Sequence, residues 1–332
     1  MRNTLLENNK VLLDKSGRPL QYGYATTPTL ATNNEAINLF RLKEWDFYQI
    51  SNEEFTVKIT YGHISLAGVM SFEIFDYKNN CYALNSLIPF PLRRLGFAPS
   101  ANSNIVYTRD TKNYKARIEV EDGRRHFVFD VKNKTLGDCH VDISLTHPVD
   151  DEGILVVTPF WHPKKFYHNY KQSCMKAEGT VFIDGKTFTI GDESLGLIDW
   201  ARGNLPLKHK WWWGNGSKIL GDDRFGFNIG GFGDTKYATE NALFFNGKTH
   251  KLDDIYYNKV GKERIDFTSS DGRFEMKFKP IFDKVTDIEL LYVDNICHQL
   301  FGYWNGYVVL DDGRKLDIKD MFAFVEFAKN QW

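Results

Sequence analysis

Apolar and polar residues alternate along many short segments of the chain, and tight-turn dipeptides separate these segments. Residues 274–279 alternate strictly, and residues 180–183 and 187–190 flank one such dipeptide. Alternation with a period of two gives a strand one buried and one exposed face. Asp-Gly and Asn-Gly favour hairpin turns because these residues tolerate positive φ angles. Five of these dipeptides lie between apolar segments, at residues 122–123, 184–185, 246–247, 271–272 and 312–313.

The pattern therefore predicts an all-β protein built from antiparallel sandwiches or barrels. Helical periodicity is confined to two short segments, residues 34–40 and 320–324. A chain of 332 residues is long enough for one large or two modest domains. The glycine-rich segment 230–234 has the most flexible composition, so we expect two lobes, at residues 1–235 and 236–332.

Charge and cysteine content exclude several classes of function. The net charge of −1 and the dispersed lysines and arginines argue against a nucleic-acid partner. The four cysteines are scattered without a CxxC pair, which is typical of reduced thiols, and we expect no metal site. No apolar run reaches the roughly 18 residues of a membrane span, and the first ten residues lack the apolar core of a signal peptide. We expect a soluble, cytoplasmic protein that uses no cofactor.

Four of the eight tryptophans lie between residues 200 and 213. On a strand, Trp211 and Trp213 would share one face and Trp212 would occupy the other. Two rings and Asn215 on one face would suit a ligand platform in a cavity wall. The alternative is a crowded sheet edge that aromatic side chains pack from both sides.

Asp199 and Arg202 precede these tryptophans. In a functional interpretation Asp199 is a general acid or base, and Arg202 sets its pKa or binds a substrate oxygen. Alternatively, the two residues form a structural ion pair that stabilises a loop.

A second group of candidates follows the tryptophans. Asn228 lies beside small residues that allow a close approach of ligand or backbone. Glu240 and Asn241 precede the Asn-Gly turn at 246–247, where they would orient a polar group or cap the end of a strand.

The order of these motifs resembles the bacterial domain-of-unknown-function 2804 family over nearly the whole chain. The segments that carry the resemblance are Trp45-Asp46-Phe47-Tyr48, Asp199-Trp200-Ala201-Arg202-Gly203, Pro206, Trp213, Gly226-Phe227-Asn228-Ile229-Gly230, Thr239-Glu240-Asn241-Ala242-Leu243, Phe301-Gly302 and Glu326. Near the N-terminus, where that family tends to have Tyr-Asn-Arg, this chain has Ala31-Thr32-Asn33-Asn34-Glu35.

More distantly, the layout is similar to the two-lobed lipocalin-like (calycin) proteins related to carotenoid hydratases. Residues 179–186, 303–308 and 325–326 carry this second likeness. It implies two lipocalin-like antiparallel β-barrel lobes. By analogy it also implies a cavity for acid–base chemistry on a largely apolar substrate.

Three functions follow from these observations. The first is a cofactor-free enzyme of hydratase, isomerase or cyclase type, acting on a hydrophobic or ring-bearing small molecule. In it a carboxylic acid protonates the substrate and creates a cation, which the tryptophan rings stabilise. Asp199 is the expected acid and Glu240 the second carboxylate. The second is a carbohydrate-active, glycoside hydrolase-like enzyme, with two carboxylates and a tryptophan platform. The third is a non-catalytic carrier or sensor of a lipid-like ligand.

Two features would separate an enzyme from a carrier. A carrier should pair Asp199 with Arg202 away from an apolar cavity, whereas an enzyme should present to the cavity a carboxylate with a raised pKa. The residues that we expect to bind the substrate are Arg202, Trp211, Trp213, Asn215, Asn228, Asn241, Trp45 and Glu326.

Overall fold

The computed structural model describes residues 3–7, 11–63, 67–78, 80–89, 94–191, 193–261, 263–290 and 293–331. Within these residues the chain forms 22 β-strands and a single turn of 3-10 helix, η1 (Asn34–Ala36), and it contains no α-helix. The prediction of an all-β protein is confirmed. No helix in the described part of the chain is both long and apolar enough to cross a membrane.

The strands form two sheets, and every strand pairing within them is antiparallel. The first sheet contains β1 (Gly23–Ala25), β2 (Leu42–Ser51), β3 (Phe55–His63), β4 (Ala67–Asp76), β5 (Cys81–Pro89), β6 (Ile105–Thr111), β7 (Tyr114–Glu121), β8 (Arg124–Asn133), β9 (Gly137–Thr146), β10 (Ile154–Pro159), β11 (Phe166–Ile183), β12 (Lys186–Ile190) and β13 (Leu195–Asn204). The second contains β14 (Lys208–Leu220), β15 (Asp223–Gly231), β16 (Ala242–Phe245), β17 (Lys248–Lys251), β18 (Ile255–Val260), β19 (Arg264–Ser269), β20 (Phe274–Leu290), β21 (Val293–Val309) and β22 (Lys315–Gln331).

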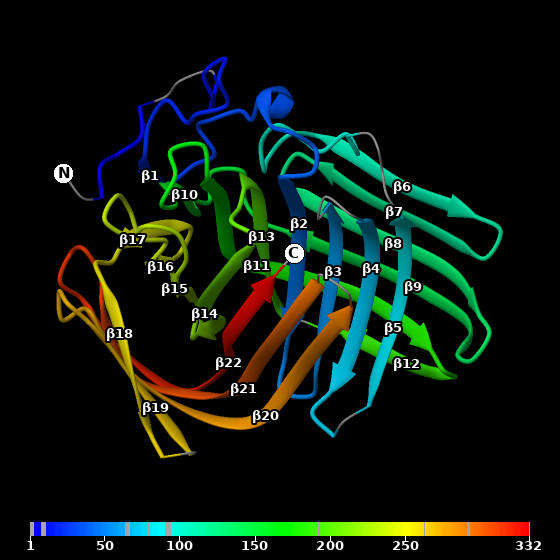
Figure 1. Ribbon diagram of the computed structural model, residues 1–332. Helices are drawn as coiled ribbons and strands as arrows, with labels where there is room; N and C mark the ends of the chain where they lie inside the picture. The colour runs from blue at the N-terminus through cyan, green and yellow to red at the C-terminus, as the bar shows by residue number, and fades with distance from the viewer. Residues whose placement is uncertain are drawn as a thin grey trace.

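Each sheet curls into a barrel-like lobe (Figure 1). The strand order is β5-β4-β3-β2-β13-β11-β9-β8-β7-β6 in the first sheet, where β10 and β12 also pair with β11, and β17-β16-β15-β14-β22-β21-β20-β19-β18 in the second. A side-chain contact links the two end strands of the first sheet, where Arg109 on β6 donates a 2.8 Å hydrogen bond to Ser86 on β5. The expected pair of lipocalin-like barrel lobes is thus confirmed.

The five predicted turns all connect consecutive antiparallel strands. Asp122, Asp184 and Asn246 have φ angles of 45°, 53° and 46°, and each is followed by a glycine with positive φ. In the other two turns, Gly272 and Gly313 adopt φ angles of 70° and 85°. Local turn chemistry therefore sets the hairpin pattern of both lobes.

The prediction of two short helical segments is largely wrong. Only residues 34–36 are helical in the first, and residues 320–324 belong to β22. Asp320 has a φ angle of 45° and lies at a β-bulge, where its backbone N–H donates to the Asn305 side chain. The extra residue of a bulge interrupts the alternation of a strand, which removes the period-two signal from this segment.

Each lobe has its own apolar core, and two smaller clusters fill the space between the lobes. One of these clusters joins Phe75 and Leu197 of the first lobe to Trp213, Phe301 and Phe324 of the second. Strand β13 is buried on both faces for this reason, since one face fills the first lobe and the other meets the second.

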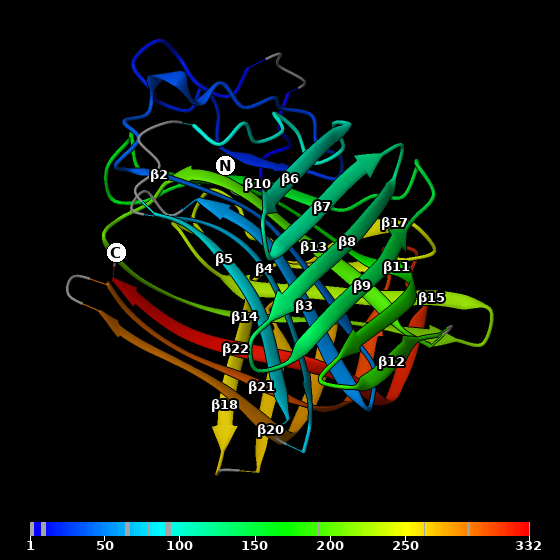
Figure 2. The same cartoon turned by 90° about the vertical axis from the view of Figure 1, so that its right-hand side faces the viewer.

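The chain passes from the first sheet to the second between Asn204 and Lys208. We expected the lobes to divide near residue 235, but β14 and β15 precede that residue and belong to the second sheet. The division near 235 stays a prediction about domains, whereas the change of sheet falls about 30 residues earlier. The N-terminal segment before β2 lies across one end of the first lobe (Figure 2), where Leu12, Leu13 and Leu30 join its core.

Candidate functional site

A cavity of about 510 Å³ lies between the two lobes. Its first wall is the outer face of β2, β3, β4, β11 and β13, and its second wall is formed by β14, β20, β21, β22 and the segment between β15 and β16. The lining residues are Trp45, Phe47, Thr60, Gly62, Val69, Ser71, Tyr167, Lys171, Asp199, Leu205, His209, Trp211, Trp213, Phe232, Glu240, Thr286, Ile288, Asn295, Cys297, Glu326 and Asn330.

Strand register explains the composition of the first wall. Lys171, Asp199, Phe47, Thr60 and Ser71 are direct cross-strand neighbours on five adjacent strands. Neighbours in one row of a sheet point to the same face. The register therefore presents a lysine, an aspartate and a phenylalanine side by side to the cavity.

Lys171 is the centre of the most strongly charged part of the site. The residue is 3% exposed, and its ammonium lies 3.0 Å from Glu240 Oε2 and 3.7 Å from Asp199 Oδ1. It also donates a 3.3 Å hydrogen bond to the Tyr167 hydroxyl. Burial acts to lower the pKa of Lys171, but the two carboxylates outweigh this effect and raise it above the usual value. One ammonium thus binds two carboxylates.

Asp199 has a second hydrogen-bond donor. The Asn169 side chain donates a 2.5 Å hydrogen bond to Asp199 Oδ1 and a 2.9 Å hydrogen bond to the Trp200 carbonyl. Because Asn169 is buried and held by the backbone, it fixes the orientation of the Asp199 carboxylate.

Glu240 reaches the site from the segment between β15 and β16. Asn228 donates a 2.9 Å hydrogen bond to the Glu240 carbonyl, and Asn241 accepts one of 2.8 Å from the Gly230 backbone. A Cβ atom at Gly230 would lie 2.4 Å from Glu240 Oε1, so any larger residue there would displace the Glu240 carboxylate. Burial raises the pKa of Glu240, and Lys171 offsets part of that rise.

Glu326 faces the cavity from the second lobe, opposite Asp199 and Lys171. It projects from β22 and accepts a 2.7 Å hydrogen bond from the Trp211 indole. Within the described residues no lysine or arginine lies within 4.0 Å of its carboxylate. Burial raises the pKa of Glu326, although the more distant Lys58 and the Trp211 hydrogen bond act in the other direction. Glu326 is therefore the cavity carboxyl best suited to hold a proton.

The tryptophans divide between the faces of β14 as the alternation predicts. Trp211 and Trp213 line the cavity, whereas Trp212 packs against Phe267 in the core of the second lobe. Trp213 donates a 2.7 Å hydrogen bond to Asn228, and its ring lies 4.6 Å from the Lys171 ammonium. This ring is thus fixed in the wall of the cavity.

The structure brings six of the predicted site residues to one cavity: Asp199, Glu240, Trp45, Trp211, Trp213 and Glu326. Three others lie behind its wall. Asn215 and Asn228 bond to each other at 3.1 Å, and Asn241 anchors the Glu240 segment by donating to the Asp253 carbonyl. Their contacts are those of residues that support the wall.

The expected pairing of Asp199 with Arg202 is wrong. Residues three apart on a strand point to opposite faces, and Arg202 accordingly points into the first lobe. There its guanidinium lies 2.7 Å from Asp46 and is stacked on Phe97 and Trp200. Arg202 is fully buried and does not line the cavity.

Sequence reasoning missed Lys171 and its neighbour Tyr167. Both faces of β11 carry polar and aromatic side chains, so no alternation marks the side that faces the cavity. Only the pairing of β11 with β13 places Lys171 beside Asp199. In the described part of the chain, no group of three or more His, Cys, Asp or Glu side chains could hold a metal ion.

Two solved structures have a similar fold. A candidate AttH from Nitrosomonas europaea has a TM-score of 0.50 and 10% identity, and the match covers 87% of this chain and 92% of that one. Kievitone hydratase from Nectria haematococca has a TM-score of 0.50 and 11% identity, with coverage of 98% and 97%. No curated protein shows significant sequence similarity to the chain.

The family comparison agrees with the order of motifs on which the resemblance was based. The model that matches is described as Domain of unknown function (DUF2804), and it spans residues 3–332. That span includes both lobes and every residue of the cavity wall. The chain belongs to the DUF2804 family.

Proposed function

We propose that this protein is a cofactor-free acid–base enzyme of hydratase type, acting on a largely apolar small molecule bound between the lobes. The observation that carries the proposal is the charge content of the cavity. Three carboxyl groups, Asp199, Glu240 and Glu326, line it, but only Lys171 lies within ion-pairing distance of any of them among the described residues. Such an excess of carboxyl groups in a buried site favours retention of a proton.

In this proposal Glu326 is the general acid. Its pKa is raised by burial, and its Trp211 contact fixes its direction. Asp199 is the general base rather than the acid expected from the sequence, because the Asn169 amide and the Lys171 ammonium both contact its carboxylate. Two carboxyl groups with different surroundings can divide the two proton transfers between them.

The reaction would proceed by protonation of a carbon–carbon double bond. Glu326 gives its proton to one carbon, and the other becomes cationic beside the rings of Trp211 and Trp213, whose π faces stabilise positive charge. A water molecule adds to the cation and loses a proton to Asp199. The product is an alcohol, and proton exchange with solvent restores both carboxyl groups.

The cavity supports an enzyme over a carrier. A carrier was expected to keep Asp199 paired with Arg202 away from the ligand, yet Asp199 lines the cavity and Arg202 lies on the other face of β13. Glu240 and Glu326, whose pKa values are both raised, also line it. A carbohydrate substrate is not favoured, because most of the surface that the wall exposes to the cavity is apolar.

The test is solvent labelling. The protein is incubated in D₂O with a panel of isoprenoid and aromatic alkenes, and mass spectrometry measures the gain of D₂O. We expect Glu326→Gln to slow labelling by a factor of about 100 or more, the usual contribution of a general acid. Glu121→Gln, which changes an exposed carboxylate on β7, is the matched control and should label at the wild-type rate. Equal labelling rates for Glu326→Gln and wild type would refute the assignment.

A further inference from the structure

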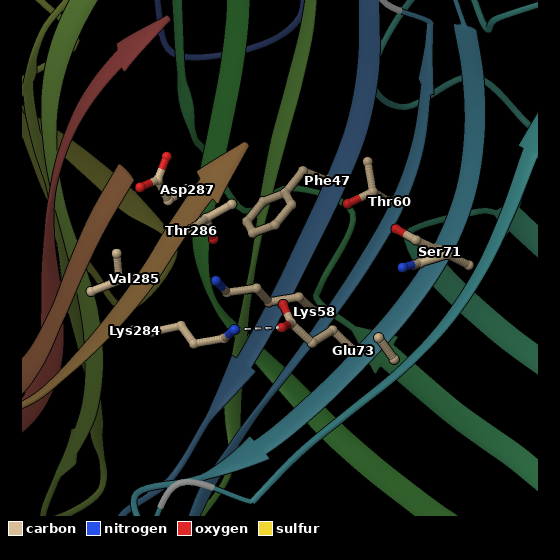
Figure 3. Close-up of a pocket in the computed structure, with 11 residues that line it drawn as sticks. Phe47, Lys58, Thr60, Ser71, Glu73, Lys284, Val285, Thr286 and Asp287 are labelled. Atoms are coloured by element: carbon tan, nitrogen blue, oxygen red, sulfur yellow. Dashed lines mark ion pairs between the residues drawn. The ribbon is translucent and has the colours of Figure 1, made fainter. Parts of the chain in front are cut away.

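A polar groove continues the interlobe cavity along β3, β4 and β20 (Figure 3). Its volume is about 380 Å³. The groove and the cavity share Phe47, Thr60, Ser71 and Thr286 as lining residues, so the two spaces adjoin. A ligand longer than the apolar cavity would extend into this groove.

Four charged side chains line the groove: the ammonium groups of Lys58 and Lys284 and the carboxylates of Glu73 and Asp287. Lys284 on β20 lies 3.0 Å from Glu73 on β4, and this ion pair joins the two lobes. Glu73 also accepts a hydrogen bond from the Cys81 thiol at 3.1 Å. Lys58 and Lys284 together hold the pKa of Glu73 below its usual value, although burial acts to raise it. Glu73 is thus fully engaged by its existing partners.

Lys58 differs from Lys284 in having no carboxylate at ion-pairing distance. Among the described residues none lies within 4.0 Å of its ammonium, which sits 5.2 Å from the centre of the Phe75 ring. In Figure 3 the side chain extends from β3 across the groove toward Thr286, while Asp287 lies at the far end of the groove. Lys58 therefore presents a positive charge at the junction of groove and cavity.

We propose that Lys58 binds the carboxylate of an amphiphilic substrate whose apolar body occupies the interlobe cavity. Among the described residues the Lys58 ammonium has no carboxylate within 4.0 Å, while Glu73 and Asp287 already balance part of the positive charge of the groove. A carboxylate head group with one negative charge therefore fits the site better than a phosphate dianion. The Thr60 and Ser71 hydroxyls line the same groove and can supply further hydrogen-bond donors to a bound head group. This inference rests on the proposed function only in taking the cavity as the substrate site.

The experiment compares two probes that differ only in the head group, dodecanoate and dodecan-1-ol. Quenching of the intrinsic tryptophan fluorescence reports binding, at a pH at which dodecanoate is ionised. We expect wild type to prefer dodecanoate by about tenfold or more, which is the usual effect of a charge-assisted hydrogen bond. Lys58→Gln should abolish the preference and keep the affinity for the alcohol, and Lys58→Arg should retain most of it. Lys277→Gln, a change of an exposed lysine on β20, should behave as wild type.

Equal affinity of wild type for the two probes, or binding of neither, would overturn the proposal without reference to any variant. A preference that persists in Lys58→Gln would also overturn it. Because binding is measured without turnover, the outcome is separate from that of the labelling experiment. Labelling that depends on Glu326, together with no head-group preference, would refute only the role of Lys58.

Discussion

Replacing Lys171 with methionine tests the charge arrangement on which the site is based. The substitution keeps a long apolar side chain but leaves Asp199 and Glu240 buried without the ammonium that lies 3.7 and 3.0 Å from them. Removal of one partner from a buried ion pair destabilises proteins by about 3–5 kcal/mol. Burial and Asp199 raise the pKa of Glu240, and Lys171 offsets part of that rise. Loss of the lysine therefore raises the pKa of Glu240 further.

The sign of the pH dependence follows from that rise. A carboxyl group whose pKa is higher in the folded state than in the unfolded state lowers stability as the pH increases through the folded value. The loss caused by Lys171→Met should therefore be largest at about pH 8 and smaller at about pH 5, where a carboxyl group takes up a proton.

Urea unfolding monitored by tryptophan fluorescence measures the free energy of unfolding at each of these two pH values. Adding Glu240→Gln to Lys171→Met should restore part of the stability, because it removes one of the unpaired charges. Lys277→Met, at an exposed position, should change stability by less than about 0.5 kcal/mol. A loss for Lys171→Met that is equally small, or that is the same at both pH values, would refute the reasoning.

Three further predictions concern other parts of the site. Trp211→Phe removes the 2.7 Å hydrogen bond to Glu326, so the pKa of that carboxyl group should rise. The pH at which turnover falls on the alkaline side should then increase by about one unit. An unchanged pH–rate profile would contradict this prediction. Gly230→Ala places a methyl group 2.4 Å from Glu240 Oε1 and should cost about 1–3 kcal/mol in urea unfolding, less when residue 240 is also alanine. Arg202→Met should cost about 3–5 kcal/mol by leaving its buried aspartate partner unpaired, while D₂O labelling per folded molecule stays at the wild-type rate; lost labelling would place Arg202 in the site after all.

The fold was predictable because its signals are local. Asp122 and Asn246 adopt the positive φ angles that their dipeptides favour, and strict alternation in residues 274–279 matches the burial of Phe274, Met276 and Phe278. The helix expected at residues 320–324 failed where a β-bulge interrupts that alternation. Turn chemistry and period two thus predict strands wherever the strands are regular.

The site was predictable only in part, because it depends on strand register. Alternation within β14 correctly separates Trp211 and Trp213 from Trp212. The same rule, applied to residues 199 and 202, would have excluded their pairing. The approach of Lys171 to Asp199 requires the register of β11 against β13, and no pattern in one strand contains that information.

The strands between the first lobe and the cavity have two faces with different roles, and this affects how the family can diversify. On β2, Trp45 and Phe47 face the cavity, whereas Asp46 and Tyr48 are buried on the other side, in the first lobe. Substitutions at alternate positions can therefore reshape the ligand space while the lobe interior is inherited unchanged. Selection for a new substrate and selection for a folded chain then act on different residues of one strand, which allows the first to proceed without disturbing the second.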